Sequence, residues 1–259
     1  MKLNKKTITE FLSNEYKDFS LYTIENRALP SAIDGFKPVH RKIAHGASSI
    51  WKTGNEKVLK VYQLSGMISN SCQYHHGDSS LNSAIINMAQ RFKNNLPLLI
   101  EDGQFGSLRS PQPGAPRYIG TKLNKIFYDI YRDNNLLDFN YEEGEKIEPK
   151  FFLPIIPMVL VNGSQGIAVG FASNILNRNS LDIITACENK LKGKKVIKIS
   201  PSIPGFKGTF RNDEDNNKKW YIRGLFERTN TTTITISELP PSMTYEKYEL
   251  ILDELVDKK

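Results

Sequence analysis

The chain of 259 residues is 39% hydrophobic and 24% charged, which excludes an intrinsically disordered protein and allows one large or two smaller packed domains. It has no run near the roughly 18 apolar residues of a membrane span, no secretory signal and only two cysteines, so we expect a soluble intracellular protein without a disulfide framework. Residues 27–126 carry thirteen basic and five acidic side chains and all four histidines, within a net charge of +7. Such a block is typical of a polyanion site, although a solvated basic face explains it equally well.

The first predicted elements are two helices. One covers residues 8–24 and starts at the capping-box spacing of Thr7 and Glu10. The next is predicted to start at Pro38, because proline fits the first turn of a helix.

The middle of the basic block is predicted to alternate between helix and loop. Residues 78–93 have the spacing of a helix that is capped by Asp78 or Ser79. Residues 101–117 contain three glycines and three prolines, which indicates an irregular loop. A helical pattern resumes over residues 117–131, so we expect the loop to end at the N-terminus of a helix.

The second half of the chain has a different character. After an acidic connector at residues 138–150, helices are predicted over residues 181–192 and from Tyr245 onward. Between these helices, four segments alternate like strands: IKISPSI, GTFRN, WYIRGLFE and TTTITISEL. The sequence therefore predicts an α+β protein, in which a helical basic domain precedes a mixed α/β domain.

Arg117 and Tyr118, at the end of the predicted loop, are candidates for phosphoryl-transfer chemistry. A phenol is neutral near pH 7, with a pKa of about 10, so it becomes a nucleophile only in a positive environment. An adjacent arginine and a helix N-terminus both stabilise a phenolate and a phosphate. An isolated Arg-Tyr pair is nevertheless usually structural, and the Tyr118 ring also suits a core position.

Two further clusters lie in the basic block. His75 and His76 are adjacent and point in different directions, so they favour contact with phosphate over ligation of one metal ion. The other cluster, for which a basic helix face is the simplest interpretation, consists of Arg27, Lys37, His40, Arg41 and Lys42. The chain has no P-loop and no D-x-D strand motif, so the sequence predicts no ATP or metal site of its own.

Taken in order, these clusters resemble the breakage-reunion subunit of type IIA DNA topoisomerases. The matching segments are RALPSAIDGFKPVHRK (27–42), YHHGDSSL (74–81), DGQFGS (102–107), APRY (115–118) and LVNGSQGIAVGFASNI (160–175). Adjacent histidines place the resemblance nearer to the eukaryotic and T-even phage enzymes than to DNA gyrase. It implies an N-terminal helical arm (1–26), a winged-helix domain (27–135) and a tower domain (151–259), without the family's C-terminal coiled coil and gate.

The resemblance also implies roles for individual residues. Tyr118 matches the tyrosine that attacks a DNA phosphate and stays joined to the 5′ end. Arg117, Arg27 and His76 match groups that assist at the scissile phosphate. Ile167 matches the residue that wedges between base pairs and bends the duplex, although its apolar character alone suggests a buried core position. The remaining expected DNA contacts are Lys37, His40, Arg41, Lys42, His75, Ser79, Ser164 and Gln165.

The same resemblance implies partners and cofactors. Mg²⁺ would be held mainly by the Toprim domain of a partner protein, and ATP would be bound by that same partner. Double-stranded DNA and two copies of this chain, each cleaving one strand, complete the expected complex, which would work in the cytoplasm, or in the host cytoplasm if a phage encodes it.

Some features depart from the family pattern and keep alternatives open. The family's GQGNFG is two residues shorter here, at Gly103–Gly106, and Ile119 and Gly120 follow the tyrosine in place of threonine and an acidic residue. One alternative is a module that bends DNA without cleaving it. Another is a metal nuclease built on His75 and His76.

Overall fold

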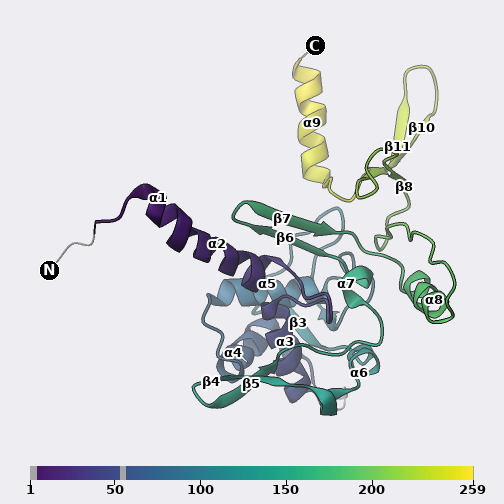
Figure 1. The fold of residues 1–259 in the computed structure, drawn as a ribbon. Coiled ribbons are helices and arrows are strands. Elements are labelled where there is room, and N and C mark those ends of the chain that lie inside the picture. The colour runs from purple at the N-terminus through teal and green to yellow at the C-terminus, as the bar shows by residue number, and fades with distance from the viewer. Residues whose placement is uncertain (1–4, 53–56, 259) are drawn as a thin grey trace.

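A computed structural model describes residues 5–52 and 57–258, and Figure 1 shows the arrangement of its helices and short antiparallel strands. This content confirms the predicted α+β class. No helix in the described part of the chain is both long and apolar enough to span a membrane.

The N-terminal arm is a continuous helical rod that projects from the rest of the molecule in Figure 1. Its segments are α1 (Ile8–Phe11), the π-helical η1 (Leu12–Tyr16), α2 (Lys17–Thr23) and the π-helical η2 (Ile24–Ala28). The predicted capping box is confirmed, since Thr7 Oγ1 accepts from the Glu10 N–H and the Glu10 carboxylate accepts from the Thr7 N–H. Its apolar side chains, such as Phe11 and Phe19, are exposed.

Three helices and a three-stranded sheet form the centre of the fold. The helices are α3 (Pro38–Ile50), α4 (Val61–Ser71) and α5 (Asp78–Ala89); the antiparallel strands, in the order β1-β3-β2, are β1 (Leu59–Lys60), β3 (Gly120–Leu123) and β2 (Leu99–Asp102). Pro38 opens α3 as predicted. The cap predicted for α5 is wrong, because Gly77 precedes this helix and no side chain caps it.

Two predictions around the sheet are wrong. Residues 117–131 are not one helix, because β3 comes first and α6 covers only Ile126–Ile130. Ile119, Leu123 and Phe127 are buried from these successive elements, and their spacing imitates one helical face. The acidic connector is a hairpin of β4 (Phe139–Glu142) and β5 (Glu145–Pro149), preceded by the 3-10 turn η3 (Asn134–Leu136); β5 packs against α3.

The rest of the chain consists of short helices and antiparallel hairpins. Its elements are α7 (Met158–Val161), β6 (Ser164–Ala168), β7 (Phe171–Ile175), α8 (Ser180–Leu191), β8 (Thr209–Asn212), β9 (Trp220–Arg223), β10 (Leu225–Arg228), β11 (Ile234–Glu238) and α9 (Tyr245–Asp257). Helices α8 and α9 confirm two predictions. The segment WYIRGLFE is two strands of separate hairpins, divided at Gly224. IKISPSI forms no strand; within it Pro201 makes only an isolated bridge to Arg178.

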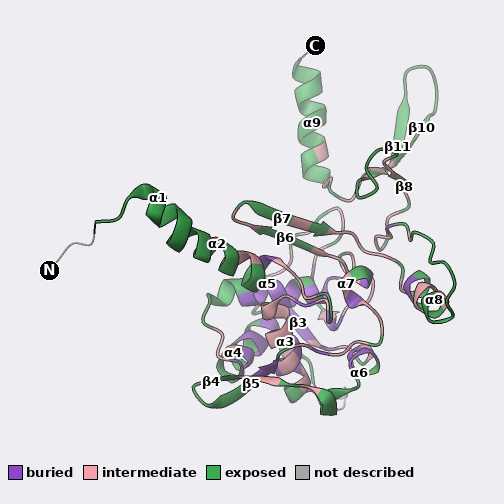
Figure 2. Ribbon diagram, viewed as in Figure 1, coloured by how far each residue is buried: buried purple, intermediate pink, exposed green. Residues whose placement is uncertain are grey.

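One apolar core extends across the predicted boundary near residue 150. Its centre is an aromatic cluster in which the Tyr131 ring lies 5.3 Å from Phe36, 4.9 Å from Phe127 and 5.6 Å from Phe152. Met158, from α7, is buried in the same cluster. By contrast, Leu239 is the only buried residue between positions 204 and 258, all of which are described, and these elements are green in Figure 2.

Candidate active site

Tyr118 lies in a turn between the glycine-rich loop and β3, and its side chain is 72% exposed. The core interpretation of this residue is therefore wrong. The Tyr118 N–H donates to the Ala115 carbonyl at 2.9 Å, and Lys60 Nζ donates to the Tyr118 carbonyl at 2.8 Å. Lys60 was not among the sequence-predicted residues, because only the folded chain brings it to the tyrosine.

The helix expected after Tyr118 is replaced by a strand, but another helix supplies positive potential at this turn. The first N–H groups of α4, from Val61 and Tyr62, donate to the carbonyls of Ile119 and Pro116, each at 3.1 Å. The positive end of the α4 dipole thus abuts the turn. Together with Lys60 and the exposed Arg117, it favours a phenolate and a phosphate at this point.

A second group of site residues is centred on His76. Arg27 Nη2 donates to His76 Nδ1 at 3.2 Å, and the Tyr74 ring meets the imidazole edge-on at 5.3 Å between centroids. Partial desolvation, followed by the charge of Arg27, lowers the pKa of His76 below its ordinary value, so the imidazole is neutral near pH 7. Because arginine only donates, Nδ1 is the acceptor and Nε2 carries the proton of the neutral ring.

The β4–β5 hairpin supports the loop that carries the histidines. Lys42 Nζ donates to the Glu148 carboxylate at 2.8 Å and to the Cys72 carbonyl at 2.6 Å, and these two charged side chains are nearly buried. His75 Nε2 lies 2.7 Å from the Glu142 carboxylate. Lys42 and His75 therefore hold the loop in place, and the placement of Lys42 argues against the DNA contact expected for it.

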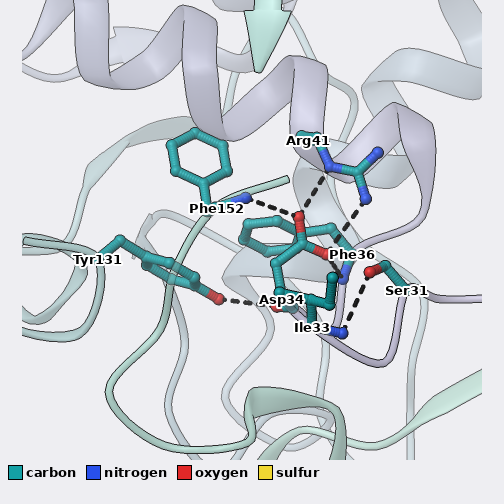
Figure 3. Close-up of polar contacts among 7 residues, drawn as sticks. All are labelled: Ser31, Ile33, Asp34, Phe36, Arg41, Tyr131 and Phe152. Carbon is teal, nitrogen blue, oxygen red and sulfur yellow. Dashed lines mark hydrogen bonds and ion pairs between the residues drawn. The ribbon is translucent and has the colours of Figure 1, made fainter. Parts of the chain in front are cut away.

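Arg41 is likewise committed to an internal contact (Figure 3). Its guanidinium donates to both oxygens of the fully buried Asp34, at 2.8 and 3.2 Å. The same carboxylate accepts the N–H groups of Phe36 at 3.0 Å and Phe152 at 3.1 Å, and the Asp34 carbonyl accepts from the Tyr131 hydroxyl at 3.2 Å. Arg41 thus joins the loop before α3 to the second half of the chain, and its placement argues against the expected contact with DNA.

Ile167 is exposed on the β6–β7 hairpin, so its core interpretation is also wrong: 81% of the residue is accessible. The neighbouring Gly166 is buried, and a Cβ there would collide with the carbonyl oxygen of Ala28. This contact seats the hairpin on η2, directly after Arg27. Lys37 Nζ donates to the Gln165 carbonyl at 2.6 Å and fixes the hairpin from its other side.

A cavity of about 770 Å³ lies beside this hairpin. Its lining includes four of the predicted contacts, namely Lys37, His40, Ser164 and Gln165. Burial lowers the pKa of Lys37, and burial followed by the charge of Lys37 lowers the pKa of His40 to about 4. Ser79 lies elsewhere, exposed in the first turn of α5.

Within one chain, the predicted catalytic residues fall into two separate groups. The Tyr118 turn contacts the first residues of α4, whereas the loop with His76 follows the last residue of that helix. Since α4 has 11 residues, the two backbones are about 16 Å apart along its axis. Arg27 and His76 therefore do not share a phosphate with the Tyr118 turn of the same chain.

A cationic surface on the β8–β9 hairpin was missed from the sequence. Arg211 and Tyr221 pair across the hairpin, with the guanidinium 5.3 Å from the ring centroid, and Arg223 is on the same face. Lys219 Nζ donates to the Tyr221 hydroxyl at 2.8 Å. Residues 127–259 are close to neutral overall, so composition by blocks concealed a patch that depends on strand register.

The described residues do not provide a magnesium site of their own. Across residues 5–52 and 57–258, no three His, Cys, Asp or Glu side chains gather closely enough to hold a metal ion. The histidine pair is also a poor nucleus for one, because the Arg27 cation occupies His76 Nδ1.

Comparison with known proteins gives consistent results. The family model for DNA gyrase/topoisomerase IV, specifically for the A-type chain of these enzymes, matches residues 27–259. The DNA topoisomerase medium subunit of Enterobacteria phage T4 is 37% identical over 259 residues, which cover 100% of this chain and 58% of that protein. DNA topoisomerase 2 of Arabidopsis thaliana is 39% identical over 97% of this chain and 17% of its own length.

A solved structure is similar in both fold and sequence. The DNA-binding, cleavage and re-ligation domain of Plasmodium falciparum topoisomerase II superposes with a TM-score of 0.86 at 36% identity, covering 95% of this chain and 34% of that one. The chain thus spans just over half of the phage relative and a smaller part of the eukaryotic proteins. From the family match and these similarities, the chain belongs to the DNA gyrase/topoisomerase IV family, on the side of its A-type chains.

Proposed function

We propose that this chain is the DNA-cleaving and religating part of a type IIA topoisomerase, and that Tyr118 is its nucleophile. The observation that carries the proposal is the exposed phenol in a turn surrounded by Lys60, Arg117 and the positive end of α4. Membership of the family, and similarity to a solved cleavage and re-ligation domain, support the same activity.

In the proposed reaction, the Tyr118 oxygen attacks a phosphate of the duplex. A bond forms between this oxygen and phosphorus while the bond from phosphorus to the 3′ oxygen breaks. The phenol gives up its proton and the 3′ oxygen gains one, so the charge is conserved. Because one phosphodiester replaces another, the reverse reaction reseals the strand without a further source of energy.

Arg27 and His76 are proposed to stabilise the phosphate during this attack. A guanidinium and the Nε2–H of a neutral imidazole are suitable donors for oxygens that gain charge in the transition state. These groups lie a helix length from Tyr118 in the same chain. The separation supports a dimer in which Tyr118 of one chain works with Arg27 and His76 of the other, at each of two strands.

The β6–β7 hairpin is proposed to bend the DNA. Ile167 projects from a hairpin whose backbone is fixed by Gly166 and Lys37, so an apolar side chain is presented on a rigid support. Inserting such a side chain costs a few kcal/mol of unstacking, which wider contact with bent DNA offsets. Ser164 and Gln165 are adjacent candidates for backbone contacts, and the β8–β9 face is a candidate for contact with flanking DNA.

The proposed domains follow from these roles. Helices α3 to α5 with the three-stranded sheet suit a winged-helix domain over residues 27–135, after a helical arm over residues 1–26. Residues 151–259 are assigned to a tower domain; residues 1–4 and 259 of these spans lie outside the described part of the chain. The shared aromatic core supports a firm junction between the two domains.

Partners supply what these residues lack. We propose that a Toprim- and ATPase-bearing partner contributes the Mg²⁺ ligands and the ATP site, and that the complex acts on double-stranded DNA in the cytoplasm. The residues described here do not fit a metal site, so no step of the proposed chemistry on this chain is assigned to the ion.

A trapped-cleavage assay tests the proposal. The chain is mixed with its Toprim/ATPase partner, Mg²⁺ and supercoiled plasmid, and the reaction is quenched with SDS. We expect protein-linked linear DNA with the natural chain and none with Tyr118→Phe, which keeps the ring and removes the nucleophile. Bending of DNA without an adduct, with an active partner, would instead support the DNA-bending module. Cleavage by this chain alone, without attached protein, would support a nuclease.

A further inference from the structure

A buried arginine joins the Tyr118 loop to the far end of the chain. Arg109 lies midway along the loop from β2 to Tyr118, and its side chain is only 12% exposed. All its contacts outside the loop are with the junction between β11 and α9: Nη1 donates to the carbonyls of Pro240 at 2.8 Å and Met243 at 3.2 Å, Nη2 contacts the Glu238 carboxylate and the Leu239 carbonyl, and the Arg109 carbonyl accepts from the Tyr245 N–H at 3.2 Å.

On one side of Arg109, backbone hydrogen bonds extend this attachment to the tyrosine. The Gly114 N–H donates to the Gln104 carbonyl at 2.8 Å, which closes the loop around Arg109. The Tyr118 N–H then donates to the Ala115 carbonyl at 2.9 Å. A displacement of Arg109 therefore has a short, hydrogen-bonded route to the Tyr118 turn.

On the other side, Arg109 holds a part of the molecule that has little core of its own. We call residues 204–258, which contain β8–β11 and α9, the distal unit. Glu238 also accepts the Lys207 N–H at 3.3 Å, so the same carboxylate ties the start of β8 to the end of β11. Because Leu239 is the only buried residue among these described positions, polar contacts such as those of Arg109 carry much of the attachment.

We propose that Arg109 is a positioning residue that couples the orientation of the distal unit to the alignment of Tyr118. A guanidinium suits this role because its donors lie in one plane and can serve several acceptors at once. A shift of the β11–α9 junction then moves the Tyr118 loop, and the reverse also holds. The inference rests on the proposed function, since this alignment affects cleavage only if Tyr118 is the nucleophile.

Amide hydrogen exchange in the whole chain tests the coupling without any activity. Arg109→Gln removes the charge, and Arg109→Lys keeps it with fewer donors. Arg91→Gln is the matched control, because Arg91 lines the same cavity of about 690 Å³ while its own side chain is 71% exposed. We expect Arg109→Gln to accelerate exchange about tenfold in both residues 103–118 and residues 238–248, with a smaller effect for Arg109→Lys and none for Arg91→Gln.

The cleavage assay with the Toprim/ATPase partner tests the consequence. We expect Arg109→Gln to slow single-turnover formation of the adduct about tenfold while the Kd for DNA changes less than about twofold, and Arg109→Lys to restore part of the rate. If Arg109→Gln does not fold, Glu238→Gln tests the same contact and should shift both peptides in the same direction.

Several results would overturn the inference. Faster exchange in residues 238–248 with an unchanged Tyr118 loop would make Arg109 a local anchor. An unchanged cleavage rate despite loosening of both segments would separate the contact from catalysis. If the natural chain forms no adduct with an active partner, the proposed function fails, and the exchange data still decide whether Arg109 couples the two segments.

Discussion

The central part of the molecule and the distal unit are stabilised in different ways. In the central part, rings from Phe36, Phe127, Tyr131 and Phe152 form a buried cluster around the Asp34 network. The distal unit consists of hairpins and one helix, with Leu239 as its only buried residue among those described. The groups proposed for cleavage are thus held by the central part, while the distal unit presents an extended surface and depends on polar attachments.

The largest predicted effect tests the central part through Asp34. Asp34→Ala leaves the buried Arg41 guanidinium and the N–H groups of Phe36 and Phe152 without their acceptor. We expect a loss of about 3–5 kcal/mol in the free energy of unfolding, measured by urea denaturation. Glu188→Gln, in an exposed pair with Lys192 at 3.1 Å, is the control and should cost less than about 0.5 kcal/mol. Equal losses would mean that the Asp34 network does not dominate stability.

A smaller effect is predicted from the pH dependence of the same region. The folded pKa of His40 is about 4, below its ordinary value of 6.5, so the unfolded chain binds the proton more tightly. The stability associated with neutral His40 is therefore present above pH 6.5 and is lost as the pH falls toward 4. We expect this loss to be about 2–3 kcal/mol.

The assignment to His40 can be checked by substitution. His40→Gln should flatten the profile of unfolding free energy between pH 6.5 and 4, measured by urea denaturation at each pH. An unchanged slope in this variant would assign the acid sensitivity to other groups.

What the sequence could predict depends on whether the determinant is local. The capping box at Thr7, the start of α3 at Pro38 and helix α9 all depend on adjacent residues and are confirmed. The strand after Tyr118 was mistaken for a helix, because buried residues from a strand and a helix together imitate one helical face. Secondary structure with this origin is visible only when the sheet partners are known.

The site shows the same division. Family motifs in the sequence identified candidate residues, but they did not distinguish those that face solvent from those that support the fold. Arg41 and Lys42 look like a basic helix face, yet each is paired with a buried carboxylate far along the chain or in a preceding loop. Lys60 and Arg109 gave no local signal, because their partners at Tyr118 and Glu238 are 58 and 129 residues away.

An exposed residue of the central part should affect DNA without affecting stability. Ile167→Ala removes an exposed side chain, so the free energy of unfolding should change by less than about 0.5 kcal/mol. We expect the bend angle of a bound duplex, measured by fluorescence energy transfer between its ends, to decrease, and DNA affinity to fall severalfold. Phe171→Ala on the partner strand is a suitable control, since Phe171 is also exposed but is not proposed to intercalate. An equal loss of bending in both variants would argue against a wedge at Ile167.

The smallest predicted effect concerns the distal unit, and it separates that unit from the central part most directly. Arg211→Gln and Arg223→Gln each remove one charge from the exposed face of the β8–β9 hairpin. If this face contacts DNA phosphates, each substitution should reduce the slope of log Kd against log salt by about one and weaken binding severalfold at low salt. Glu227→Gln, on exposed β10, is a control that changes charge without removing a cation. The trapped-cleavage yield at saturating DNA should stay unchanged in both arginine variants, because the groups proposed for cleavage lie in the central part. A full salt slope in the double variant would remove the distal unit from the DNA path and leave its attachment through Arg109 as its link to the Tyr118 loop.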